Sequence, residues 1–407
     1  MIAPWRVLAA AAACLLAACS SSVDSLGTDA PPVEEERGLS PLTGPANYPN
    51  PFHDVLGIPE SDIENRIAAA FEQLFRGNPM TQAIYEPRGS DQATIRDILH
   101  NDERTEGIGL GMMFAVQRGE QEIVDRLWRY ANATLRQSGG SGYFVSNCDT
   151  LDGATTPCVD PYGMQQMAMA LVFAHGRFGS SGSVDYEADA LALLDLMRAG
   201  DGTSGSTPLF DAETKIVFAE PKLTSASFTC SAYMMHAYYE LWAQATGDSF
   251  FSDAAMAARA YYPVAAHPTT GLLPTRTDLS GMPYDGWEAF RHEAYRAPLN
   301  LVLDTIWIGA DTWQTQEANR LIRFFNGQGI DQYGGVYALD GAVLDPMREP
   351  ALVAANGAVA AIATEAARNA FIQAAWDLET PTGPNRYYTG LLHLFSLMVL
   401  GGQFRVY

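Results

Sequence analysis

The spacing of apolar residues constrains the fold of this chain more than any other feature. Apolar side chains recur at helical intervals in about a dozen segments, and connections rich in Gly, Pro and Asp separate these segments. No strand-like pattern alternates with them, as it would in a parallel β/α fold. The sequence therefore predicts an all-α protein. The expected helices start at Ser61 and continue over 106–118, 120–137, 164–178, 184–198, 230–246, 252–260, 292–308, 313–326, 350–367, 368–378 and 387–400.

Several of these segments are apolar over a wide arc of the helix rather than along one stripe. Residues 167–174 and 391–400 are clear examples, and a helix of this kind is packed on two sides. An inner ring of helices inside an outer ring meets that requirement. With 407 residues, 47% of them hydrophobic, the chain is long enough to close such a double ring. We expect one (α/α)6 barrel over residues 51–407.

The acidic balance of the sequence argues against nucleic acid as a partner. The formal net charge is -22, from 47 acidic and 25 basic residues, and such a surface repels phosphate backbones. Neutral and cationic substrates stay compatible with this charge. No Cys/His spacing is typical of a zinc site, so we expect no metal. We also expect no cofactor, and we expect a monomer.

The start of the chain is typical of a bacterial lipoprotein. A basic residue precedes an apolar run that is too short to span a membrane. The tetrad Leu16-Ala-Ala-Cys19 resembles a lipobox, in which the Cys becomes the lipidated first residue of the mature protein. We expect a signal peptide over 1–18, a lipid on Cys19, a flexible tether over 19–50 and a location at the outer membrane, facing the periplasm or the surface. The alternative is an ordinary signal peptide cut near Ala18.

Three cysteines remain in the expected folded body. Cys148 and Cys158 bracket a loop without apolar period, and in an oxidising compartment they predict a disulfide that stabilises the fold by roughly 2 to 3 kcal/mol. Cys230 lies among aromatic residues, and we expect a buried free thiol there rather than a nucleophile.

Glu106 is the acidic residue in the most unusual surroundings. It opens a strongly apolar helix, and Gly107, Gly109 and Gly111 leave room for a ligand to approach the backbone. Desolvation in such a place can raise the pKa of a carboxyl and keep it protonated as a general acid. The other interpretation is an acid that favours the helix start, with glycines that permit tight packing.

Five blocks of sequence, in order along the chain, resemble one known family. They cover 101–107, 210–215, 237–242, 292–300 and the ending 387–392 with 404–407. Together they are similar to glycoside hydrolase family 8, with the closest look to its xylanase and reducing-end xylose-releasing exo-oligoxylanase branch. The resemblance implies an (α/α)6 barrel and an inverting hydrolase of β-1,4-linked polysaccharide or oligosaccharide, most of all xylan and xylo-oligosaccharides.

Inversion requires two carboxyl groups about 6.5 to 9.5 Å apart, one protonated to release the leaving group and one ionised to activate water. The resemblance implies that Glu106 is the acid and that Glu293 stands where the family carries an Asp base. Because of this departure an alternative stays open. In it, Glu293 pairs with Arg296 one helical turn on, and Asp285 or Glu288 is the base.

A second departure concerns the Asp that holds the sugar at the cleavage point in the family. Ungapped alignment places Tyr162 there, and Asp160 fills the role if the loop differs. The resemblance also implies that Arg104 contacts substrate, that Tyr233 helps to position the attacking water and that Arg296 neighbours the base. Tyr233 has a structural alternative, because its segment is rich in Tyr and Met and an aromatic there is often part of the core.

Aromatic residues are expected as platforms for sugar rings, because a planar ring covers the apolar face of a pyranose. Trp128 and Trp287 are the main candidates, and Tyr143, Phe290 and Tyr337 are further ones.

Other functions stay compatible with the same residues. The chain could act on a β-1,4-glucan or chitosan, or be a degenerate relative that binds oligosaccharide without cutting it. Endo and exo action are both open, because the loops at 201–206 and 338–349 are candidates for closing one end of a cleft.

Overall fold

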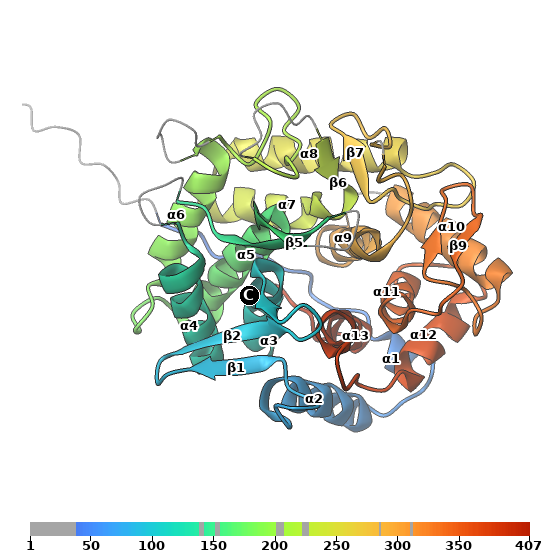
Figure 1. The fold of residues 1–407 in the computed structure, drawn as a ribbon, viewed down its shortest axis with the longest axis horizontal. Helices are drawn as coiled ribbons and strands as arrows, with labels where there is room; N and C mark the ends of the chain where they lie inside the picture. Colours follow the sequence, from blue (N-terminus) through green and yellow to red (C-terminus); the bar gives the residue numbers. More distant parts are fainter. Residues whose placement is uncertain are drawn as a thin grey trace, which may run out of the picture. The chain divides into compact units, whose positions relative to one another are not determined.

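Alternate helices along the chain form an inner ring. The computed structural model describes residues 38–137, 142–150, 155–200, 207–221, 228–284, 286–309 and 312–407. The inner helices are α3 (Thr105–Arg118), α5 (Pro161–Phe178), α7 (His236–Thr246), α9 (Ala297–Leu303), α11 (Pro350–Ala360) and α13 (Arg386–Leu400). Each contacts the next in this order, and α13 contacts α3 again, which closes the ring (Figure 1).

The intervening helices pack outside this ring. They are α2 (Glu60–Arg76), α4 (Gln121–Tyr130), α6 (Tyr186–Ala199), α8 (Ser249–Ala265), α10 (Trp313–Gln328) and α12 (Arg368–Asp377), and a single turn, α1 (Pro51–Asp54), precedes them. Helix α2 packs on α13, α4 on α3, α6 on α5, α8 on α7, and both α10 and α12 on α11. The predicted (α/α)6 barrel is confirmed.

Burial differs between the two rings as the apolar patterns predict. In α11 every residue after the first is buried, and α13 is buried over most of its length. Helix α2 instead buries one stripe that includes Ile63, Ile67 and Leu74. The inner helices are therefore covered on two sides, and the outer helices expose one face to solvent.

The helices α3 and α5 approach each other closely at two glycines. A Cβ at Gly109 would lie 2.6 Å from the Cβ of Gln166, and a Cβ at Gly163 would overlap the backbone of Thr105 and Glu106. No larger residue fits at either position without a backbone shift. The start of α5 is thus fixed against the start of α3.

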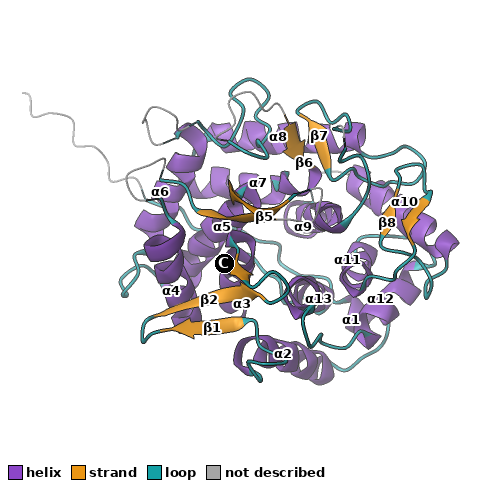
Figure 2. Cartoon of the chain, viewed as in Figure 1, coloured by secondary structure: helices purple, strands orange, loops and turns teal. Residues whose placement is uncertain are grey.

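Short antiparallel sheets of two or three strands lie in the connections between the helices (Figure 2). The apolar pattern did not predict them, because a strand of two to six residues is too short to show a period of two. The strands are β1 (Tyr85–Arg88), β2 (Gln92–Asp97) and β3 (Asp102–Glu103) in one sheet, β4 (Val145–Asp149) with β5 (Thr155–Val159), β6 (Phe228–Cys230) with β7 (Arg276–Asp278), and β8 (Val336–Tyr337) with β9 (Val343–Asp345).

Three predicted helices are not regular α-helices. The segment predicted over 230–246 begins with the end of β6 and a 3₁₀ helix, η2 (Ser231–Tyr233), and α7 starts only at His236. The segment predicted over 292–308 begins with a 3₁₀ helix, η3 (His292–Arg296), before α9, and it ends in a π-helix, η4 (Asp304–Ile308). The segment predicted over 120–137 ends in a second π-helix, η1 (Ala131–Leu135). The tighter winding of η3 matters below, because this helix carries Glu293.

The compact unit begins at Gly38, so the predicted end of the tether at residue 50 is wrong. Leu39 is buried, and its backbone N–H donates to Glu187 at 2.6 Å. The backbone N–H of Ser40 donates to the carbonyl of Ala245 at 2.7 Å. Composition alone did not reveal these anchoring contacts. The predicted signal peptide, Cys19 and the rest of the tether lie outside the described residues.

The membrane predictions concern the same undescribed start of the chain. Within the described ranges, no helix combines the length and the apolar character needed to cross a bilayer.

Candidate active site

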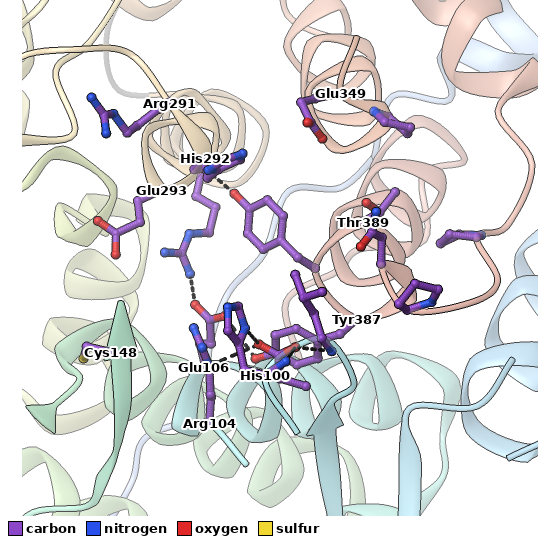
Figure 3. A pocket seen from close by; sticks show the side chains of 18 of the residues that line it. His100, Arg104, Glu106, Cys148, Arg291, His292, Glu293, Glu349, Tyr387 and Thr389 are labelled. Carbon is purple, nitrogen blue, oxygen red and sulfur yellow. Dashed lines mark hydrogen bonds and ion pairs between the residues drawn. The ribbon is translucent and has the colours of Figure 1, made fainter. Parts of the chain in front are cut away.

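A cavity of about 750 Å³ lies where several inner helices begin. Glu106 enters it from the first turn of α3, Asp160 from the residue before α5, and Tyr387 from the first turn of α13. Glu293 enters it from η3. In Figure 3 Glu106 and Glu293 come from different parts of the ring and face the same space. Segments that are far apart in the sequence therefore build one site.

Glu106 is held at both oxygens of its carboxyl. The hydroxyl of Tyr387 donates to Oε1 at 3.0 Å, and the guanidinium of Arg296 forms an ion pair with Oε2. The side chain of Glu106 stays 13% exposed, and it lines the cavity. The carboxyl is thus fixed in orientation but open to a ligand, as the sequence predicted for an acid at a glycine-rich helix start.

Arg296 is a buried cation beside this carboxyl. Burial disfavours its charge, but Glu106 and the neighbouring tyrosines raise the pKa of Arg296 well above its ordinary value. Its guanidinium also lies over the ring of Tyr162, 4.1 Å from the ring centre. The sequence left open an ion pair between Arg296 and Glu293; in the structure the partner of Arg296 is Glu106.

Asp160 rather than Tyr162 lines the cavity. Its carboxylate caps α5 by accepting from the backbone N–H groups of Tyr162 and Gly163, at 3.0 and 3.1 Å, and it accepts from the hydroxyl of Thr105 at 3.0 Å. Burial and the charge of Glu106 raise the pKa of Asp160 to about 6. Tyr162 is buried below it, and burial raises its pKa to about 12. The structure therefore brings Asp160 and not Tyr162 to the cavity, and its contact with a sugar stays a prediction.

Glu293 is half-buried, and it lines the cavity as predicted. The thiol of Cys230 donates to its Oε2 at 3.9 Å, a distance within the range of sulfur hydrogen bonds. Of the substitutes for Glu293, Glu288 is exposed, accepts from the backbone N–H of Gly286 and does not line the cavity. Asp285 lies outside the described residues.

Arg104 and Tyr233 also line the cavity. The guanidinium of Arg104 lies 3.2 Å from Asp97 and 3.2 Å from Asp102. Tyr233 is 5% exposed, and burial raises its pKa well above the ordinary value. Both residues therefore line the cavity, and the substrate contact of Arg104 and the water-positioning role of Tyr233 stay predictions.

Only one of the predicted aromatic platforms lies at this cavity. Trp287 lines it, half-buried, with the guanidinium of Arg276 3.7 Å from its ring centre. The prediction for Trp128 is wrong, because its ring is buried against Phe144 and its indole N–H donates to Asp189 at 2.6 Å. Tyr143, Phe290 and Tyr337 are likewise buried and do not line the cavity.

The structure adds residues that sequence reasoning missed. The Nδ1 of His100 lies 2.7 Å from a carboxylate oxygen of Asp97, and Tyr388 donates to the backbone carbonyl of His292. Glu349 lines the side of the cavity opposite to Glu106 in Figure 3. The block at 387–392 supported the resemblance but carried no predicted role, because the sequence does not show whether a tyrosine side chain faces a cavity or the core.

The predicted disulfide between Cys148 and Cys158 is present, with 5.8 Å between the Cα atoms. It joins β4 to β5, and Cys148 lines the cavity (Figure 3). The side-chain amide of Asn147 donates to Asp102 at 3.0 Å, which ties this hairpin to β3, the strand just before α3. The hairpin thereby forms one wall of the site.

Two carboxyl groups that face one cavity can act as an acid and a base on a bound molecule. No set of three or more His, Cys, Asp or Glu side chains in the described ranges is grouped as metal ligands. The arrangement suits a reaction that moves protons between side chains, water and substrate.

Comparisons with known proteins show what the chain is similar to. The model of glycosyl hydrolases family 8 matches residues 89–402. The reducing-end xylose-releasing exo-oligoxylanase Rex8A of Paenibacillus barcinonensis is 32% identical over 368 residues, which cover 86% of this chain and 94% of the relative. A reducing end xylose-releasing exo-oligoxylanase of Halalkalibacterium halodurans is 32% identical over 377 residues, with coverage of 88% and 94%.

Solved structures show the same likeness. The structure of Rex8A from Paenibacillus barcinonensis complexed with xylose has a TM-score of 0.82 at 31% identity, and it covers 89% of this chain and 98% of that one. A GH8 xylobiose complex from Teredinibacter turnerae has a TM-score of 0.82 at 29% identity, with coverage of 88% and 98%.

Proposed function

Because the chain belongs to glycosyl hydrolase family 8 and is a glycoside hydrolase, we propose that it cleaves β-1,4-linked xylo-oligosaccharides with inversion. Glu106 acts as the general acid and Glu293 as the general base. The observation that carries the proposal is the convergence of these two carboxyl groups on one cavity from α3 and η3. The substrate class follows from relatives named for xylose release and from solved structures with xylose and xylobiose bound.

The surroundings of Glu106 fix the place of its carboxyl beside a second acidic group. Two carboxyl groups, Glu106 and Asp160, lie near one buried cation, Arg296. Burial, and then the like charge of Glu106, disfavour the ionised form of Asp160. The pKa of Asp160 is raised to about 6, so this side chain is mostly protonated below that pH. Tyr387 and Arg296 orient the Glu106 carboxyl toward the glycosidic oxygen.

The surroundings of Glu293 suit activation of water. Its Oε2 accepts from Cys230, and Arg296, the nearest strong cation on its own helix, is paired with Glu106. Glu293 therefore keeps a carboxylate oxygen for a water molecule on the opposite face of the sugar ring. Trp287 also lines the cavity, and its half-buried ring offers a surface for an adjoining sugar.

Incubation of the protein with xylo-, cello- and chitosan oligosaccharides tests the proposal, with Glu106→Gln as the control. We expect shorter products from xylo-oligosaccharides alone, and none from the variant. Proton NMR during the first turnovers should detect the α-anomer at the new reducing end, as inversion of a β-linkage requires. Release of xylose alone would indicate exo action, and a ladder of products endo action.

Two results would contradict the proposal. Products from cello- or chitosan oligosaccharides alone would replace the substrate class. Oligosaccharide binding without any products would favour the degenerate sugar-binding relative instead.

We further propose that a lipid on Cys19 anchors the protein to the outer membrane. The lipobox-like tetrad ending at Cys19 supports this location, and the compact unit begins only at Gly38. Membrane fractionation and mass spectrometry of the mature N-terminus test it. We expect the wild-type protein in the membrane fraction with a lipid-sized mass increase, and Cys19→Ser in the soluble fraction; an unmodified wild-type N-terminus cut near Ala18 would contradict the proposal.

A further inference from the structure

The wall behind Glu293 contains a buried thiol that the proposed reaction has not used. Cys230 ends β6, it is 1% exposed, and its Sγ lies 3.9 Å from Oε2 of Glu293. It is the free cysteine of the described residues. Burial and the charge of Glu293 raise its pKa to about 12, so the sulfur keeps its proton at any ordinary working pH and can only donate to the carboxylate.

Backbone pairing fixes the place of this thiol. Cys230 pairs with Arg276 across the β6–β7 ribbon, and Ser231 behind it donates to the carbonyl of Pro274 at 2.5 Å. The guanidinium of Arg276 lies between two rings, 3.7 Å from the centre of Trp287 and 5.4 Å from that of Phe228. The ribbon therefore holds Cys230 in a rigid wall beside Glu293.

We propose that Cys230 is a positioning residue for the general base: its thiol donates to Oε2 of Glu293 and holds the carboxylate with Oε1 turned toward the attacking water. This inference rests on the proposed role of Glu293.

The type of donor matters as much as its position. A thiol is a weak hydrogen-bond donor, so it orients the carboxylate without strongly favouring its ionised form. A hydroxyl or a cation at the same place would stabilise the ionised form more and make the carboxylate a poorer base. A Glu side chain has several rotatable bonds to restrain. The small Cys230 is buried beside Glu293 and contacts its carboxylate.

Other titratable or charged groups also interact electrostatically with Glu293. They are Arg276 from β7, Arg296 from η3, Tyr233 from the turn after β6, and Tyr388 from α13. All of them are unchanged in the variants below, so a shift of the pH profile reports the change at position 230.

The kinetic test compares Cys230→Ala and Cys230→Ser. Loss of the donor in Cys230→Ala should lower kcat by about three- to tenfold, with KM changed less than about twofold. The acidic limb of the kcat/KM profile should move to higher pH in Cys230→Ala and to lower pH in Cys230→Ser, because that limb reports the base of the free enzyme. Ser231→Ala is the matched control: it removes a hydrogen bond of the same wall without touching Glu293, so it should lower Tm but leave the limb in place. An unchanged kcat and unchanged limbs in both Cys230 variants would overturn the proposal.

A spectroscopic test does not depend on activity. In the full chain with Cys14→Ser and Cys19→Ser, and with the Cys148–Cys158 disulfide intact, the S–H stretching band in the Raman spectrum comes from Cys230. We expect this band to move to higher wavenumber in Glu293→Ala, because the acceptor is gone. An unmoved band would overturn the hydrogen bond itself. If the band moves but the protein cleaves no sugar, the hydrogen bond between Cys230 and Glu293 is supported and the proposed hydrolysis is contradicted.

Discussion

Tyr387 donates a hydrogen bond of 3.0 Å to Oε1 of Glu106, although 281 residues separate them in the sequence. Tyr387→Phe removes this bond and keeps the buried ring. We expect kcat to fall about tenfold, as for the loss of one hydrogen bond to a charged group, because the acid loses its fixed orientation. Steady-state kinetics on xylo-oligosaccharides measure it. Tyr407→Phe is the control, because Tyr407 bonds Arg177 outside the cavity; an equal loss in both variants would contradict the prediction.

Glu293 and Glu288 offer a matched pair of carboxyl groups on one segment. Glu293→Gln should lower kcat by about 10² to 10⁴, the usual contribution of a general base, because an amide cannot take the proton of water. Glu288→Gln should retain most of the activity, since Glu288 is exposed and does not line the cavity. Measured kcat values for the two variants decide between them, and a larger loss in Glu288→Gln would reassign the base.

Gly163 controls the approach of α5 to the acid. A methyl group there would overlap the backbone of Thr105 and Glu106, so Gly163→Ala should destabilise the fold by about 1 to 3 kcal/mol and lower kcat. Gly327→Ala within α10 is the control, because its Cβ would meet no atom within 4 Å. It should stabilise by less than about 1 kcal/mol. Thermal denaturation compares the two variants. Equal Tm values would contradict the prediction, because they would show that α3 and α5 can move apart without loss of stability.

The raised pKa of Asp160 predicts a pH dependence of stability. Its pKa is about 6 in the folded protein, against an ordinary 3.8. Between these values the folded state binds more protons than the unfolded state, so the free energy of unfolding falls as pH rises from about 4 to about 6. Above about pH 6, Asp160 makes no further contribution to the pH dependence. Asp160→Asn should flatten this part of the curve, because an amide does not titrate.

Urea denaturation over this pH range measures the effect. Asp185→Asn serves as the control, because Asp185 caps α6 in the same way at an exposed position. Curves of the same slope for Asp160→Asn and the wild type would show that Asp160 does not titrate in this range.

The ring of helices was readable from the sequence because the inner helices are apolar on nearly all sides. That signal is strong in α5 and α13, and the structure has helices at both places. The strands were not readable, since a pair such as β6 and β7 contains three residues on each side. Their pairing depends on the barrel that carries them rather than on a local pattern.

The site was predictable where chemistry and sequence context agreed. Glu106 and Glu293 were identified through their blocks, and both line the cavity. Trp128 was misplaced because an aromatic residue has the same local signal in a core as in a cleft. The choice between Asp160 and Tyr162 required the path of the loop before α5, and no single sequence contains that path.

The joining of Glu106 to Arg296 and Tyr387 also sets when activity returns as the chain refolds. The two contacts span 190 and 281 residues, and contacts between such distant positions form slowly because long loops must close first. The acid is held in place only after α13 has packed against α3. A nascent chain that still lacks α13 therefore has no Tyr387 to hold the acid, whatever helices it has already formed.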